Sequence, residues 1–155
     1  MKDRKDPKEI VIEITKDFEG IEVDLAKFEK LVHAVCDLFD ITKAVISIAI
    51  VGDAQISKVN AQFLNHDGST DVISFDLSDC DTDSKVFDLV VNAQMAIRQA
   101  ESRPHSSQAE LALYITHGLL HNFGFDDLQP DQAKKMHETE DKILQQQGFG
   151  LVYNS

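Results

Sequence analysis

Lys43-Ala44-Val45-Ile46-Ser47-Ile48-Ala49-Ile50-Val51 contains the longest apolar run in the sequence. It is almost continuously apolar and rich in β-branched side chains, which predicts a strand buried on both faces. We therefore expect a sheet at the centre of the molecule, built from this stretch and from others like it.

Segments on either side of this strand alternate between strand and helix patterns. Further strands are predicted at 9–14, 70–75 and 86–91, and helices at 24–39, 53–63, 92–101, 106–123 and 130–147. Asp24 and Asp53 are expected to cap the helices that follow them, and Ser107 with Glu110 has the spacing of a capping box. The order predicts a single α/β (α+β) domain over 1–155, with about four strands in a mixed sheet and helices concentrated in the C-terminal half.

Composition and charge narrow the class of protein. The chain has 155 residues, of which 43% are hydrophobic and 27% charged, as in an ordinary globular domain. Its formal net charge of −12 counts against a nucleic-acid partner, because phosphates repel an acidic surface. A bound metal ion or a local basic cluster such as Lys134-Lys135 offsets that repulsion.

The location of the protein is predicted from what the chain lacks. The first residues are polar and do not resemble a signal peptide, and the longest apolar run, 44–51, is far below the ~20 residues that span a bilayer. Cys36 lies in a helical pattern and Cys80 in an acidic loop, and neither belongs to a CxxC pair. We expect a cytoplasmic protein with two free thiols and no membrane contact.

The chemically informative stretch is Thr116-His117-Gly118-Leu119-Leu120-His121-Asn122-Phe123-Gly124-Phe125-Asp126-Asp127. His117 and His121 lie four residues apart, so a helix presents both imidazoles on one face. Gly124 can end that helix, after which Asp126 or Asp127 can reach the same ion. Two helical histidines are also common as partly buried core residues. Three protein ligands with a free fourth position are nevertheless typical of a catalytic zinc site.

The general base is not evident from this stretch. A thermolysin-type HExxH motif carries glutamate after its first histidine, whereas here that position is Gly118. Either another residue acts as the base or a metal-bound water suffices. The catalytic residues beyond the metal ligands are therefore left unassigned.

At these residues the sequence resembles the YbeY family of bacterial rRNA maturation factors, described as metal-dependent endoribonucleases. The metal motif of the family, H-G-x-L-H-x-x-G-x-D-H, matches 117–127 at every fixed position except the last. The family patterns L-N-x-x-[YF]-R and P-T-[DN]-V-L-S-F resemble 59–64 and 69–75. Its G-D-[IL]-V-I strand resembles 87–91, and its D-x-A-x-x-M-x-x-x-E pattern resembles 131–140.

The resemblance implies a function and a set of partners. It implies a single-strand-specific endoribonuclease that acts in rRNA processing and maturation of the small ribosomal subunit, with one divalent ion per chain, zinc being the expected metal. The implied ligands are His117, His121 and Asp127, beside a substrate groove formed by Thr70, Asp71 and Ser74. The implied partners are pre-rRNA, the small subunit and an assembly GTPase, with no DNA.

Four positions depart from the family pattern. Asp127 replaces the third histidine, and carboxylate remains an acceptable zinc ligand. Leu64 replaces an arginine, which would have held phosphate. Ser69 replaces a proline and Phe87 a glycine, and we interpret both as loop or backbone adjustments. Two rival functions follow: a ribosome-assembly or RNA-binding factor with reduced or no nuclease activity, and a metal-dependent hydrolase of a non-RNA substrate.

Several other polar residues have competing interpretations. Asp71 is either a groove residue or a solvent-facing strand carboxylate, and Asp126 either orients a metal ligand or caps the turn after Gly124. His137, one helix further on, is an alternative third ligand, but we expect it to be solvated or to contact a ligand from behind. The acidic residues Glu138, Glu140 and Asp141 are predicted to form a solvated helix face.

Overall fold

A four-stranded sheet forms the centre of the structure, a computed structural model that describes residues 8–150. Its strands are β1 (Glu9–Lys16), β2 (Lys43–Val51), β3 (Val72–Asp76) and β4 (Lys85–Asn92). They lie in the order β1-β2-β4-β3, with β1, β2 and β4 parallel and β3 antiparallel to β4. The prediction of a mixed sheet of about four strands is confirmed.

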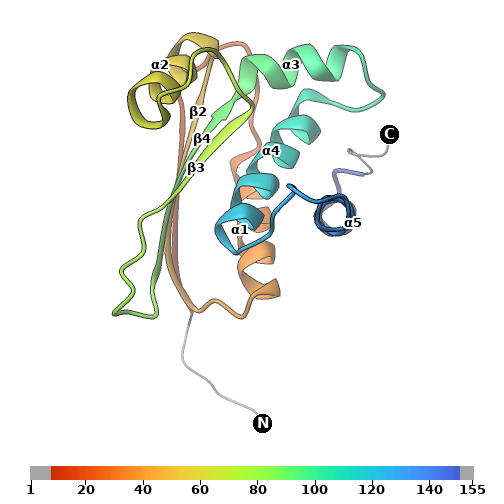
Figure 1. Cartoon of the computed structure of the whole chain (residues 1–155). Helices are drawn as coiled ribbons and strands as arrows, with labels where there is room; N and C mark the ends of the chain where they lie inside the picture. Colours follow the sequence, from red (N-terminus) through yellow and green to blue (C-terminus); the bar gives the residue numbers. More distant parts are fainter. Residues whose placement is uncertain (1–7, 151–155) are drawn as a thin grey trace.

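The helices cover the sheet unequally. They are α1 (Leu25–Leu38), α2 (Asp53–Leu64), α3 (Ala93–Glu101), α4 (Ser107–Asn122) and α5 (Pro130–Gln146). Figure 1 shows α1, α4 and α5 on one side of the sheet, with α2 on the other side at one end. Helix α4 lies between the sheet and α5 and is buried along most of its length. The fold therefore places the predicted metal helix at the centre of the core.

Helix ends follow the capping rules at most positions. The Asp24 carboxylate accepts the Lys27 backbone N–H and begins α1 as predicted. Asp53, however, is the first residue of α2, and Gly52 occupies the cap. The prediction that Asp53 caps the helix is therefore wrong by one residue, because the carboxylate of Asp53 is engaged elsewhere.

The predicted capping box on α4 is also wrong. The cap is Ser106, whose hydroxyl accepts the Ala109 N–H, and not Ser107. Glu110 is only 2% exposed and instead accepts a hydrogen bond from His105 Nε2 at 2.6 Å. A buried side-chain hydrogen bond has replaced the local capping contact that the spacing indicated.

Strand β2 is buried on one face along its whole length but only partly on the other. Ala44, Ile46, Ile48 and Ile50 face the helical core, whereas Val45 remains 40% exposed on the opposite face. The prediction of a strand buried on both faces is wrong for its first half, because α2 covers the second face only near Val51, through Ile56. The apolar composition did not distinguish these two halves.

Gly118 allows α4 to lie unusually close to the sheet. A Cβ atom at this position would lie 3.1 Å from both Leu89 Cδ2 and Val72 Cγ2. A side chain here would press against two methyl groups in the core, so only glycine fits without displacement. The close approach brings the faces of α4 that carry His117 and His121 beside β3.

A polar cluster around Asp53 ties α2 and α3 to the segment that leads into β3. Arg98 donates hydrogen bonds to both carboxylate oxygens, at 2.6 and 3.2 Å. Asn92 Nδ2 donates to Asp53 Oδ1 at 2.7 Å, and Ser69 Oγ donates to the same oxygen at 2.8 Å. These contacts hold the pKa of the Asp53 carboxyl well below its usual range, the Arg98 hydrogen bond being the largest cause.

Candidate metal centre

Three predicted ligands converge where α4 ends. His117 Nε2 and His121 Nε2 lie 3.1 Å apart, as expected for two imidazoles one helical turn from each other. Gly124, with φ of 102°, turns the chain back after α4. Asp127 Oδ2 then lies 3.8 Å from His117 Nε2 and 3.9 Å from His121 Nε2. The structure thus brings all three residues into one cluster.

A fourth residue, Glu140 of α5, stands behind His117. His117 Nδ1 donates a hydrogen bond to Glu140 Oε2 at 2.6 Å. Glu140 is 0% exposed, and its other oxygen, Oε1, is buried and accepts no hydrogen bond from the described residues. The imidazole therefore lies between a buried carboxylate on one side and the two other ligands on the other.

Acidic groups dominate the electrostatics around His117. Burial of the ring would by itself lower the pKa of His117. The hydrogen bond to Glu140 and the charges of Glu140, Asp71 and Asp127 outweigh burial, and the pKa of His117 is raised. The site has a strong excess of negative charge.

These residues fit a divalent cation. Each of the three offers one ligand atom, all within 4.8 Å of one another, and imidazole nitrogen with carboxylate oxygen is a usual zinc donor set. The buried Glu140 carboxylate makes one hydrogen bond and, among the described residues, no contact with lysine or arginine. A cation on the far side of the His117 ring would balance this charge.

Glu140 is the residue that the sequence analysis missed. The prediction of a solvated acidic face is wrong for Glu140 and for Asp141, which are 0% and 5% exposed. A signal was present, because Glu140 lies on the same helical face as the buried Met136, Ile143 and Leu144. A carboxylate in the apolar stripe of a helix needs a buried partner, and His117 is that partner.

The other polar residues near the metal loop take distinct roles. Asp126 Oδ1 accepts the Leu128 N–H at 3.0 Å, so Asp126 caps the turn that follows Gly124. His137, on α5, is half-buried and lies outside the group of three converging ligands. These positions agree with Asp127, rather than Asp126 or His137, as the third ligand.

The predicted groove residues lie at the start of β3 and within it. Asp71 is half-buried, its Oδ1 accepts the Val72 N–H at 2.7 Å, and its charge acts on the His117 ring. The Thr70 hydroxyl donates to the same carboxylate at 3.3 Å. Ser74 lies two residues after Val72 and on the same face of the strand. Since Val72 faces Gly118, Ser74 points toward α4. Their role in substrate binding stays a prediction.

The departures from the family pattern fall into different surroundings. Leu64 ends α2 and is 42% exposed, while the neighbouring Phe63 packs edge-on against Phe75 with ring centroids 5.9 Å apart. Ser69 belongs to the Asp53 cluster. Phe87 is fully buried and packs against Phe123 at the end of α4, with ring centroids 5.1 Å apart. Interpreting Phe87 as a backbone adjustment is wrong, since its ring supports the metal helix.

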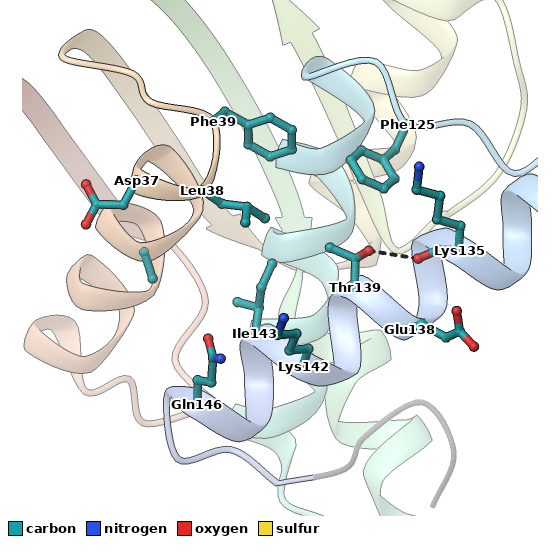
Figure 2. A pocket seen from close by; sticks show the side chains of 11 residues that line it. Asp37, Leu38, Phe39, Phe125, Lys135, Glu138, Thr139, Lys142, Ile143 and Gln146 are labelled. Atoms are coloured by element: carbon teal, nitrogen blue, oxygen red, sulfur yellow. Dashed lines mark hydrogen bonds between the residues drawn. The ribbon is translucent and has the colours of Figure 1, made fainter.

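A larger hollow lies beside the metal centre rather than at it. This hollow has a volume of about 670 Å³. Figure 2 shows it between the end of α1 and α5, with Phe39 and Phe125 at one end and Lys135 and Lys142 along α5. A smaller hollow is also lined by Phe125 and Lys135 and reaches Asp126, in the loop between α4 and α5. Neither hollow is lined by His117, His121 or Asp127.

Comparison with known proteins places this geometry in a family. The family described as endoribonuclease YbeY matches residues 13–148, a range that contains the three candidate ligands and Glu140. The chain belongs to the YbeY family. The fold and the ligand cluster above are thus those of a YbeY protein with aspartate as its third candidate ligand.

Curated YbeY relatives match over most of their length. The endoribonuclease YbeY of Carboxydothermus hydrogenoformans is 32% identical over 143 residues, covering 88% of this chain and 97% of that protein. The endoribonuclease YbeY of Bacillus licheniformis is 30% identical over 152 residues, covering 90% and 96%. A solution structure from Thermotoga maritima, 20% identical, superposes with a TM-score of 0.58 over 88% of this chain and 91% of that one. The last likeness concerns the fold alone.

The lengths and polarity of the helices decide whether any of them could span a membrane. Between residues 8 and 150, every helix is too short or too polar to cross a bilayer.

Proposed function

We propose that this YbeY chain is a metal-dependent, single-strand-specific endoribonuclease that acts on pre-rRNA during maturation of the small ribosomal subunit in the cytoplasm. The observation that carries the proposal is the convergence of His117, His121 and Asp127 with buried Glu140 behind them. The names of the relatives, endoribonuclease YbeY, support the reaction class. The proposal includes the small subunit and an assembly GTPase as partners.

The two candidate histidine ligands lie on a rigid helix, whereas the candidate aspartate lies on an accessible loop. His117 and His121 lie on the buried helix α4, so their positions are fixed by the core. Asp127, 39% exposed at its side chain, lies on the loop and leaves one side of the cluster open to a substrate. A divalent ion held there would supply an activated water and a positive charge for the scissile phosphate. Asp71, beside His117, lines the approach from β3.

The test is RNA cleavage by the purified chain reconstituted with zinc or manganese. We expect cleavage of a single-stranded oligoribonucleotide, little cleavage of the matching duplex, and loss of activity with chelator and in His121→Ala. Peptide and ester substrates in the same assay test the non-RNA hydrolase alternative. Metal bound without any RNA cleavage would contradict the nuclease proposal.

A second candidate function is ribosome assembly or RNA binding with little or no cleavage. The observation that favours it is Leu64, an apolar, half-exposed side chain where the family pattern has a phosphate-binding arginine. Co-sedimentation with small-subunit particles, measured beside the cleavage assay, separates the two functions. Binding without cleavage would support this second candidate.

A further inference from the structure

Glu140 is too deeply buried to be an ordinary helix carboxylate. It is 0% exposed, on a helix face that otherwise buries Met136, Ile143 and Leu144. Its only hydrogen bond among the described residues joins Oε2 to His117 Nδ1, and Oε1 is buried without one. Burying a carboxylate in this way destabilises a fold unless a cation or further hydrogen bonds balance the charge.

The geometry of the hydrogen bond selects one form of the imidazole. A carboxylate only accepts, so the proton of a neutral His117 ring must lie on Nδ1. Nε2 then carries the lone pair, and Nε2 is the atom that faces His121 and Asp127. The opposite tautomer would place a hydrogen atom where a ligand atom is needed.

The two histidines differ in which helix holds them by a hydrogen bond. His117 is held from behind by α5, whereas the hydrogen bonds found for His121 among the described residues reach only His117 on the same helix. Among the described residues, the hydrogen bond from α5 therefore reaches His117 and not His121. One ligand of the site is oriented by a segment 23 residues away in the chain.

From these contacts we propose that Glu140 is a positioning residue, which holds His117 with its proton on Nδ1 and Nε2 directed at the ion and whose buried charge increases metal affinity. The inference rests on the metal site of the proposed function and is independent of the RNA substrate. It assigns to α5 a part in metal binding in addition to its part in the core.

The decisive variant is Glu140→Gln, which keeps the size of the side chain and removes its charge. The matched control is Glu138→Gln, an exposed glutamate on the same helix. Zinc affinity is measured by competition with a chromophoric chelator, and the His117 tautomer by nitrogen-15 NMR of the metal-free protein. Thermal unfolding of the metal-free proteins shows whether each variant folds.

We expect Glu140→Gln to weaken zinc binding by about 10–100-fold, the usual effect of removing a carboxylate behind a ligating histidine, while Glu138→Gln changes nothing. The metal-free Glu140→Gln protein should unfold at the same or a higher temperature, since an incompletely bonded buried charge is gone. The fraction of neutral His117 with its proton on Nε2 should rise.

Other outcomes would overturn the inference. Unchanged zinc affinity with an unchanged tautomer means that Glu140 does not position His117, although the metal site and the proposed function stand. A loss of affinity that tracks a loss of metal-free stability means that Glu140 is merely structural. A wild-type chain that binds no divalent metal would overturn the proposed function together with this inference.

Discussion

Asp127 is the residue on which the candidate ligand set depends most. Its Oδ2 is 3.8 and 3.9 Å from the two histidine nitrogens, and Asp126 beside it is engaged in the turn. With two neutral imidazoles and one carboxylate, a divalent ion would keep a net charge near +1 at its ligands. This weakens its pull on water relative to three imidazoles.

Asp127→Ala should weaken metal binding more strongly than any single change outside the cluster, by more than about 100-fold, because a direct ligand is lost. His137→Ala and Asp126→Asn should change it little, since neither side chain belongs to the converging group. Asp127→His should tighten zinc binding. Isothermal titration with zinc measures all four proteins, and a larger loss in His137→Ala would show that the third ligand is misassigned.

Leu64→Arg should accelerate cleavage of single-stranded RNA. A well-placed arginine lowers the barrier by about 2–4 kcal/mol, or roughly 10²–10³ in rate. We expect a smaller gain, on the order of 10-fold, because Leu64 ends α2 and is 42% exposed, so that a new guanidinium is not held in place by the core. Leu64→Gln is the uncharged control of similar size.

The rate of RNA cleavage by the wild-type chain also tests whether an arginine is needed at position 64. Arg98 cannot replace the missing arginine without giving up Asp53, with which it forms two hydrogen bonds. If the native chain already cleaves RNA rapidly and Leu64→Arg adds nothing, then the positive charge comes from elsewhere. Arg103, 39% exposed and 3.7 Å from Glu110, is then the next residue to replace.

Among the helices and loops, the cluster of candidate ligands was predictable from local spacing. The burial of Glu140 was signalled by its helix face, but its partner His117 was not. A spacing of four places His117 and His121 on one helix face, and the glycine turn allows either Asp126 or Asp127 to reach them. The resemblance to the family pattern selected Asp127. The contact between His117 and Glu140 depends on how α5 docks on α4, which no local pattern specifies. For the same reason, the apolar run of β2 did not reveal which half of its second face α2 covers.

The Asp53 carboxylate, which joins α2 to α3, should make the stability of the protein depend on pH. Its pKa is lowered in the folded protein, so its contribution to stability is present above the unfolded value of about 3.9 and is lost as the pH falls through the folded value. Asp53→Asn should therefore lower the free energy of unfolding at pH 7, and the difference from wild type should shrink below about pH 4.

Urea unfolding at pH 7 and at pH 3.5 measures this difference. Asp67→Asn, at an exposed position in the loop after α2, is the control and should show no such pattern. A constant, non-zero difference at both pH values would mean that the variant loses stability through contacts that do not depend on charge, and that the charge of Asp53 contributes nothing.

At the scale of the whole molecule, an ion in this site would join three segments of the C-terminal half. Two ligands belong to α4, one to the loop before α5, and the residue behind His117 to α5 itself. Because a metal ion binds the folded chain and not the unfolded one, occupancy adds stability by mass action. Stability and metal content should therefore change together.

Zinc at 100 times its dissociation constant should stabilise the chain by about 2.7 kcal/mol and raise the unfolding temperature by about 5–10 °C. Differential scanning fluorimetry with zinc and with chelator measures the shift. His121→Ala, which removes a ligand from a half-buried position, should show none. An equal shift in that variant would place the bound zinc elsewhere, with the exposed Asp79-Cys80-Asp81 group the first to examine.

The close packing at Gly118 should limit which side chains the protein accepts at this position. Alanine there gains about 1 kcal/mol of helix propensity but must displace Leu89 and Val72, each 3.1 Å from the added carbon, at a cost of about 1–3 kcal/mol. In a library of all substitutions at this position, selected for folded protein, alanine should be the least depleted and every larger residue strongly depleted. Substitutions at Gly68, where an added carbon meets nothing within 4 Å, should be depleted only by its φ of 95°. A uniform tolerance at both glycines would mean that α4 can move off the sheet, and with it both histidines.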